Sequence, residues 1–128
     1  MPIEKYFDET KRALSHFSPF ILSNSITFET RSFAFGKIKG CIIFVDSSRL
    51  YLLEIIDATQ QEKIHYSYHH QTKNGKTVFR YDDAPHHKEI KSFPHHKHSE
   101  NEQNVLATNE PSLYTVLKEI STSFLKTI

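Results

Sequence analysis

The stretch "KIKGCIIFVDSSRLYLLEIIDA", Lys37 to Ala58, decides the fold. Its first half begins by alternating polar and apolar residues and then becomes continuously apolar, as expected of a central strand. Its second half, from Arg49 onward, indicates another well-buried strand. The "DSSR" at 46–49 between them has the composition of a tight turn. The stretch therefore predicts an antiparallel hairpin at the centre of a sheet.

The segments on either side of this hairpin extend the sheet. Before it, "SITFETRSFAF" at 25–35 alternates in polarity, and after it "EKIHYSYHHQT" at 62–72 does the same. Asn74-Gly75 is a strong signal for a tight hairpin, and "TVFRYDD" at 77–83 is the returning strand. We predict a meander of about five antiparallel strands joined by short links.

Each end of the chain predicts a helix. Apolar residues recur at helical spacing near the N-terminus until Ser18-Pro19, and again in "EPSLYTVLKEI" and the residues after it. The residues 84–104 between the last strand and the second helix have no sustained period. They predict a long loop, with at most a short edge strand near 92–98. The fold class is α+β: an antiparallel meander sheet with an N-terminal and a C-terminal helix, in a single domain over residues 1–128.

Composition limits the cellular setting. The single cysteine, Cys41, lies in an apolar run, so an intramolecular disulfide is impossible and a buried inert thiol is expected. The N-terminus does not resemble a signal peptide, and no apolar run approaches the roughly 18–20 residues that span a bilayer. We expect a soluble, cytoplasmic protein with no membrane partner.

The net charge of +1 conceals an asymmetry. Residues 63–98 hold seven Lys or Arg against three Asp or Glu, which gives +4, whereas the rest of the chain is −3. Eight of the nine histidines also lie in this basic segment. Such a polarised chain predicts an anionic partner for one face.

Histidines dominate "FRYDDAPHHKEIKSFPHHKH" at 79–98, which repeats the tetrapeptide "PHHK". A metal site would require ligands at a recognised spacing, but no HExxH or paired CxxC pattern is present. Lys88 and Lys97 flank the histidine pairs, and a cation beside a divalent metal is unfavourable. We predict neither a metal nor another cofactor. A solvated loop that happens to be rich in histidine is the alternative without function.

Acid–base chemistry on RNA would use the same residue types. Cleaving RNA without a metal requires a base, an acid and a cation that stabilises the phosphorane, and histidine supplies the first two near neutral pH. Arg80, Lys88 and Lys97 are candidate cations, and Tyr81 is a candidate to stack on a base. Asp82 and Asp83 are not expected to be a catalytic pair, because adjacent side chains on a strand diverge. The candidate acid–base residues are His86, His87, His95, His96 and His98, with Lys97 beside them.

The segment "FRYDDAPHH…FPHHKH" resembles the TumE-like family, the toxin components of prokaryotic type II toxin–antitoxin modules. The similarity extends from about Phe33 to Ile120, through the central hairpin, "YSYHHQTKNGKTVFRYD" and the C-terminal helix. The family often has Asn where this chain has Asp83, an added negative charge that would oppose phosphate binding. Carried over by position, the motif covers Arg80, Tyr81, Asp82, Pro85, His86, His87, Pro94, His95, His96, Lys97 and His98.

The resemblance implies a cytoplasmic toxin that a cognate antitoxin protein neutralises. Together with the residues, and by analogy with other toxins, it predicts a metal-independent endoribonuclease acting on RNA. Two alternatives stay open: a metal-dependent nuclease using the same histidines, and a binding module without catalysis that docks an antitoxin or a nucleic acid. The oligomeric state is also open, a homodimer included.

Overall fold

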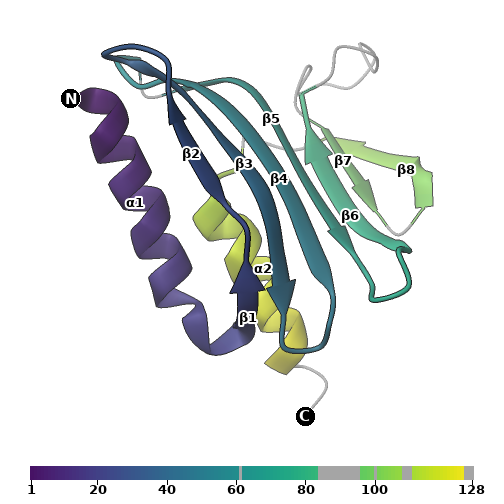
Figure 1. Cartoon of the computed structure of the whole chain (residues 1–128). Coiled ribbons are helices and arrows are strands. Elements are labelled where there is room, and N and C mark those ends of the chain that lie inside the picture. Colours follow the sequence, from purple (N-terminus) through teal and green to yellow (C-terminus); the bar gives the residue numbers. More distant parts are fainter. Residues whose placement is uncertain (61, 84–95, 100, 108–110, 126–128) are drawn as a thin grey trace.

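The structure is a computed structural model that describes residues 1–60, 62–83, 96–99, 101–107 and 111–125 (Figure 1). Helices α1 (Pro2–His16) and α2 (Leu113–Leu125) lie near the two ends of the chain, and the 3-10 turn η1 (Ser18–Phe20) follows α1. The strands are β1 (Ile21–Asn24), β2 (Thr27–Thr30), β3 (Phe35–Phe44), β4 (Arg49–Asp57), β5 (Glu62–Gln71), β6 (Thr77–Asp82), β7 (His96–Ser99) and β8 (Asn101–Ala107). The predicted α+β class is confirmed.

The strands form one antiparallel sheet in meander order. The order across the sheet is β1-β3-β4-β5-β6-β7-β8, and β2 pairs with the same edge of β3 as β1 does. The predicted central hairpin is confirmed, with Phe35 opposite Asp57 and Ile43 opposite Arg49. At its turn, Ser47 has a positive φ of 71°. The Asp46 carboxylate accepts the backbone N–H of Ser48 at 2.9 Å, which is the turn chemistry that the "DSSR" sequence predicts.

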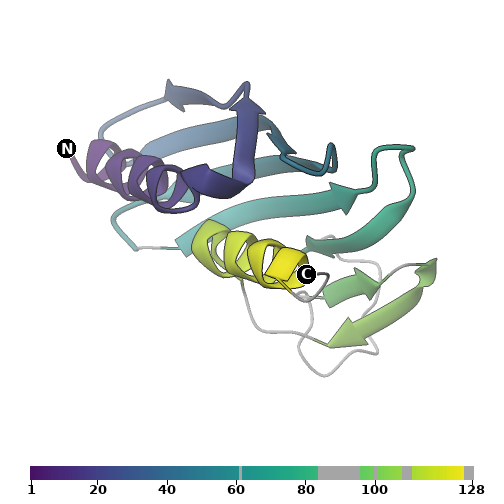
Figure 2. The same ribbon diagram turned by 90° about the horizontal axis from the view of Figure 1, so that it is seen from below.

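Both helices cover the same face of the curved sheet (Figure 2). The even-numbered residues of β4 are buried there, while the odd-numbered ones are exposed or half-buried, as the period of two requires. Helix α1 approaches β3 closely at Gly36, where an added Cβ would lie 2.6 Å from the Ile3 side chain. Among the described elements, no helix lies against the opposite face of β3–β6, which we call the open face.

One buried carboxylate lies within this apolar layer. Glu54 of β4 accepts hydrogen bonds from the hydroxyl of Tyr6 at 2.5 Å and from that of Tyr68 at 2.6 Å. Because Tyr6 belongs to α1 and Tyr68 to β5, Glu54 joins the helix to two neighbouring strands. Burial and the neighbouring Glu54 raise the pKa of Tyr68 well above its ordinary value. Both oxygens of the Glu54 carboxylate accept hydrogen bonds from tyrosines, so its role is structural.

The described sheet has eight strands, more than the roughly five predicted, and β1 was not predicted. Two further details also differ. The segment at 25–35 does not form one strand, because β2 ends at Thr30 and β3 begins at Phe35. Of the long loop expected over 84–104, residues 84–95 lie outside the described residues, whereas 96–99 and 101–104 are strand: β7 matches the short edge strand predicted near 92–98, and β8 was not predicted. The polar sequence of β8 hid it, because an edge strand gains backbone hydrogen bonds without needing an apolar side-chain pattern.

Neither helix in the described part of the chain is long and apolar enough to cross a membrane.

Candidate functional site

The pairing of β6 with β7 brings part of the predicted site together. Arg80 lies opposite His98, Tyr81 opposite Lys97, and the Asp82 position opposite His96. Because side chains alternate along a strand, Arg80 and Tyr81 point to opposite faces of the sheet. The predicted residues are therefore divided between two separate polar networks, one on each face.

On the open face, the Arg80 guanidinium contacts Asp82 and His98. Its Nε lies 2.9 Å from Asp82 Oδ2, and its Nη2 lies 3.1 Å from His98 Nε2. His98 Nε2 is also 3.6 Å from Asp82 Oδ2. We call these three residues the Arg80 cluster. Asp82 and His98 are buried, whereas 29% of the Arg80 side chain is exposed, so Arg80 is the member that reaches the surface.

The donors and acceptors fix the protonation of His98 in this cluster. A guanidinium has only donors, so the bond to Arg80 requires His98 Nε2 to accept. His98 is then neutral, with its proton on Nδ1, and a second proton on Nε2 would break the bond to Arg80. The carboxylate and the imidazole together orient one partly exposed guanidinium, a group suited to gripping a phosphate.

On the helix face, Tyr81 and Lys97 share one partner on α2. The Tyr81 hydroxyl donates to Glu119 Oε1 at 2.6 Å, and Lys97 Nζ donates to Glu119 Oε2 at 3.0 Å. Lys97 Nζ also lies 5.0 Å from the centre of the Tyr81 ring. Burial and the hydrogen bond to Glu119 raise the pKa of the Tyr81 hydroxyl. This network ties β6 and β7 to α2, and it does not bring Lys97 or Tyr81 into the Arg80 cluster.

Asp83 forms a third contact, just beyond the end of β6. Its Oδ1 accepts the backbone N–H of Tyr66 at 3.2 Å and lies 2.7 Å from His65 Nδ1. The two neighbouring aspartates thus reach different partners, as expected of adjacent side chains. The sequence analysis did not single out His65, and it named Asp82 only as part of the motif, without its contact to Arg80. The spacing of Arg80 and Asp82, two residues apart on a predicted strand, is the signal that could have found Asp82.

The adjacent histidines of β5 are separated by the sheet. His70 is buried on the helix face, where its Nε2 lies 3.0 Å from Ser48 Oγ. Burial lowers its pKa to about 4, so it is neutral near pH 7. His69 is half-buried on the open face, with its Nε2 2.8 Å from Thr77 Oγ1. His69 therefore lies on the face of the Arg80 cluster, and His70 belongs to the core.

Several predicted site residues cannot be placed with this cluster. His86, His87, Lys88 and His95 lie outside the described residues. His96 is placed by its backbone only, opposite Asp82. His98 lies at the end of the short edge strand predicted near 92–98; it is a strand residue, and its exposure is only 2%. Among the side chains that the structure describes, no group of three or more His, Cys, Asp or Glu could hold a metal ion.

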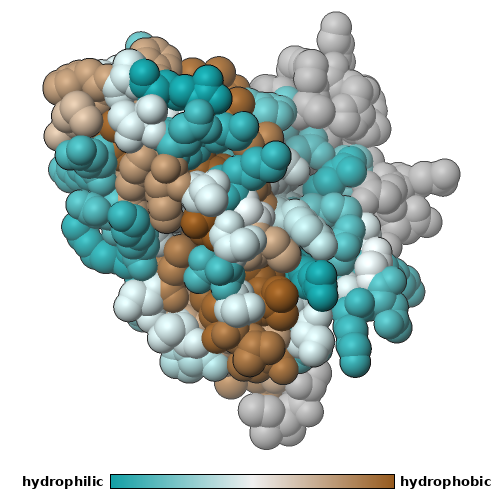
Figure 3. All heavy atoms as spheres, viewed as in Figure 1, coloured by the Kyte–Doolittle hydropathy of each residue, from teal (hydrophilic) through white to brown (hydrophobic). Residues whose placement is uncertain are grey.

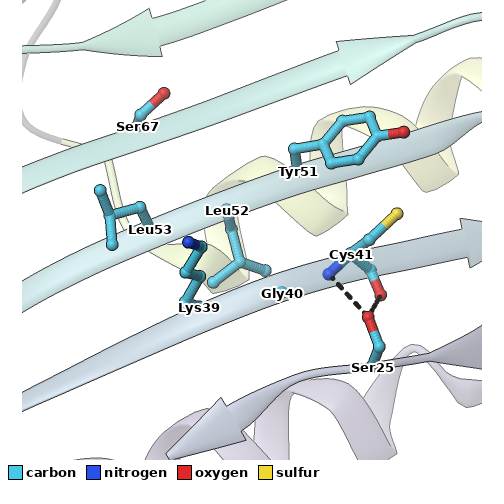
Figure 4. A pocket seen from close by; sticks show the side chains of 8 residues that line it. All are labelled: Ser25, Lys39, Gly40, Cys41, Tyr51, Leu52, Leu53 and Ser67. Carbon is cyan, nitrogen blue, oxygen red and sulfur yellow. Dashed lines mark hydrogen bonds between the residues drawn. The ribbon is translucent and has the colours of Figure 1, made fainter.

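A shallow hollow of about 420 Å³ lies on the open face over β3, β4 and β5 (Figure 4). Tyr51, Leu53 and Ser67 point into it, and the helices lie behind the sheet. At its border, Ser25 Oγ donates to the Cys41 carbonyl at 3.4 Å and accepts from the Cys41 N–H at 3.3 Å. On this face hydrophobic surface gathers mainly over the lower ends of β3 and β4, and hydrophilic residues interrupt it above and toward β5 and β6 (Figure 3). Cys41 is half-buried, and burial raises the pKa of its thiol.

Comparison with known proteins gives one match. The family model described as "Toxin TumE" matches residues 10–124. Searches of the curated proteins and of the solved structures gave no match. The matched range contains all eight strands, the second half of α1 and nearly all of α2, and with them the whole Arg80 cluster. The chain therefore belongs to the TumE toxin family and is the toxin component of a toxin–antitoxin system.

Proposed function

We propose that the protein is an endoribonuclease toxin that cleaves RNA without a metal ion. The observation that carries the proposal is the Arg80 cluster, in which a carboxylate and a neutral imidazole orient a partly exposed guanidinium. The basic segment at 63–98, which contains this cluster, supports a polyanionic substrate. The family supports a toxic activity, and RNA cleavage is a common activity of such toxins by analogy.

The proposed reaction is an internal transfer of the phosphoryl group. A general base removes the proton of a ribose 2′-hydroxyl, whose oxygen attacks the adjacent phosphorus. The bond from phosphorus to the 5′-oxygen then breaks, and a general acid gives that oxygen a proton. The products are a 2′,3′-cyclic phosphate and a 5′-hydroxyl. No water or cofactor is consumed in this step, so the protein need supply only two proton-transfer groups and one cation.

Arg80 is the proposed cation. A guanidinium can grip two phosphate oxygens at once, and the negative charge on them grows in the phosphorane. Asp82 and His98 act through Arg80 as positioning residues, because both are buried and both contact its guanidinium. We do not propose a direct acid–base role for His98, because a side chain with 2% exposure is poorly placed to reach the RNA.

The proposed acid and base are histidines of the two "PHHK" repeats. His96 is the first candidate, because its backbone lies opposite Asp82 in the strand pair that carries the cluster. His86, His87 and His95 are the remaining candidates, and Lys88 is a second candidate cation. Lys97 and Tyr81 are better explained as structural residues, since both bind Glu119 beneath the sheet.

We further propose that the toxin acts in the cytoplasm, where its substrate is present and a cognate antitoxin protein neutralises it.

The test compares Arg80→Ala with Arg12→Ala, a change of an exposed arginine on α1. Purified proteins are incubated with a defined RNA, with and without excess EDTA. The wild type and Arg12→Ala should cleave equally well with EDTA present, and Arg80→Ala should be slower by about 100- to 1,000-fold, the usual cost of losing one stabilising donor. Arg80→Lys should recover only part of the rate, because an ammonium cannot form the bidentate contact.

Three results would contradict the proposal. Complete loss of cleavage with EDTA would indicate a metal-dependent nuclease. Unchanged cleavage by Arg80→Ala would remove Arg80 from the reaction. No cleavage by the wild type under any condition, with RNA still bound, would indicate a binding module.

A further inference from the structure

Five open-face positions form a row that runs straight across the sheet. Cys41 of β3 lies opposite Tyr51 of β4, Tyr51 opposite His69 of β5, His69 opposite Arg80 of β6, and Arg80 opposite His98 of β7. We call this set the central row. Since neighbouring strands are roughly 4.8 Å apart, the row spans about 19 Å. One end lies at the hollow, and the other lies in the Arg80 cluster.

Tyr51 is the large aromatic side chain of this row. Its exposure is 42%, although it lies near the middle of the sheet rather than at an edge. In Figure 4 its ring is seen broadly face on, over the strand and beside Cys41. An exposed aromatic face on an open sheet is a surface on which an unpaired base can stack. Tyr51 is two strand spacings, or roughly 10 Å, from the position of Arg80.

Two cationic side chains, Lys39 and Arg49, lie in or near the hollow. Lys39 lines it, and its Nζ is directed out of the sheet in Figure 4. Arg49, two residues before Tyr51 on β4, is also exposed on this face. Two acidic residues on this side are already engaged: Glu29 pairs with Arg31 at 3.1 Å, and Asp46, in the turn before Arg49, accepts hydrogen bonds from Ser48. The rim near Tyr51 is thus positive, which suits a phosphate backbone.

We infer that single-stranded RNA lies across the open face along the central row, with one base stacked on Tyr51 and backbone phosphates near Lys39 and Arg49. This inference rests on the proposed function, which puts the scissile phosphate at Arg80, the fourth position of the row. A duplex fits poorly, since its bases are already stacked on one another and cannot stack on Tyr51. An extended peptide would be expected to pair with a sheet edge, not to cross five strands.

The first experiment measures binding without cleavage. The probe is a fluorescent 2′-O-methyl single-stranded RNA of about 12 nucleotides, a length that covers a typical single-strand site and lacks the attacking hydroxyl. Tyr51→Ala should weaken Kd by about 5- to 150-fold, and Tyr51→Phe should retain the wild-type Kd because it keeps the ring. Tyr114→Ala is the matched control: Tyr114 lies on α2, and its 44% exposure is close to that of Tyr51. Its Kd should equal that of the wild type.

The second experiment separates stacking from charge. Lys39→Gln should weaken binding and reduce the slope of log K against log salt by about 0.7, the value for one phosphate contact on a single strand. Tyr51→Ala should leave that slope unchanged. A duplex of the same sequence should bind more weakly than the single strand.

The outcomes distinguish this inference from the proposed function. Cleavage by the wild type together with an unchanged Kd for Tyr51→Ala would overturn the RNA path and leave the ribonuclease intact. Duplex binding as tight as single-strand binding would overturn it equally. If Tyr51→Ala instead abolished only neutralisation by the co-expressed cognate antitoxin, the open face would be the antitoxin site and the inference would be wrong. A failure of the wild type to bind RNA at all would overturn both.

Discussion

His70 is a buried histidine, and among the described atoms only one of its two ring nitrogens has a hydrogen-bond partner. Its Nε2 contacts Ser48, which donates in turn to Asp46 Oδ1 at 2.5 Å. That arrangement makes His70 Nε2 the donor, and its buried Nδ1 has no hydrogen-bond partner among the described atoms. The ring packs at 5.2 Å from that of Phe79. His70 therefore belongs to the core in its neutral form, and charging it would cost stability.

The pH dependence of stability follows from this burial. The folded-state pKa of about 4 lies below the ordinary 6.5, so the unfolded chain binds a proton in the interval where the folded chain does not. Stability is thus lost as pH falls from about 6.5 toward 4. Between about pH 7 and pH 5, the proton uptake of His70 on unfolding should lower the free energy of unfolding by roughly 2 kcal/mol.

Urea unfolding of the wild type and of His70→Gln at both pH values checks the prediction. The drop in the free energy of unfolding from pH 7 to pH 5 should be smaller in the variant than in the wild type by about that amount. This difference should hold even if the variant is less stable at neutral pH. An identical pH dependence in the two proteins would show that His70 is not a buried neutral group.

The candidate site shows which single residues a sequence can identify. Arg80 was one of three candidate cations, with Lys88 and Lys97, and it stays a prediction, favoured because arginine is suited to a phosphate. His98 was predicted as an acid–base residue and is now proposed as a positioning residue. Its burial depends on the pairing of β7 with its neighbours, which the polar sequence after His98 does not reveal. The contacts of Lys97 and Tyr81 with Glu119 join residues far apart in the chain. No local pattern predicts such contacts, so the division between the two faces appeared only in the fold.

At the scale of elements, β4 shows how strictly the sheet separates its faces. Leu52 is 3% exposed and packs toward the helices, whereas its neighbour Leu53 is half-buried on the open face. Leu52→Ala should lower the free energy of unfolding by roughly 2–5 kcal/mol, because it removes contacts and leaves a cavity in the core. Leu53→Ala, the same change one residue along, should cost roughly 1 kcal/mol or less. Denaturant unfolding of both variants measures the difference, and equal losses would contradict the assignment of the faces.

The elements that the sequence predicted well are those with a strong pattern. The hairpin at 37–58 combines alternation, an apolar run and a turn, and the helices have apolar stripes at helical spacing. Strands β7 and β8 have no such apolar pattern, and they are held in the sheet by backbone pairing with β6 and with each other, with β7 also joined to α2 through Lys97. Pairing partners of this kind are fixed by the three-dimensional sheet and not by the polarity of the segment.

At the scale of the whole molecule, the sheet separates structure from proposed function. The helix face holds the apolar core, the Glu54 carboxylate and the Glu119 network, all of which join elements together. The open face holds the Arg80 cluster, the hollow and the cationic rim. Substitutions on the helix face should therefore act through stability, and those on the open face should act on toxicity while the protein stays folded.

The chemical ends of the RNA products test the central claim most directly. Purified toxin is incubated with a defined RNA in excess EDTA, and the fragment ends are identified by mass spectrometry. The proposed mechanism predicts a 2′,3′-cyclic phosphate on one fragment and a 5′-hydroxyl on the other, because the 2′-oxygen is the nucleophile. Fragments carrying a 5′-phosphate and a 3′-hydroxyl, formed only when a divalent metal is present, would contradict it.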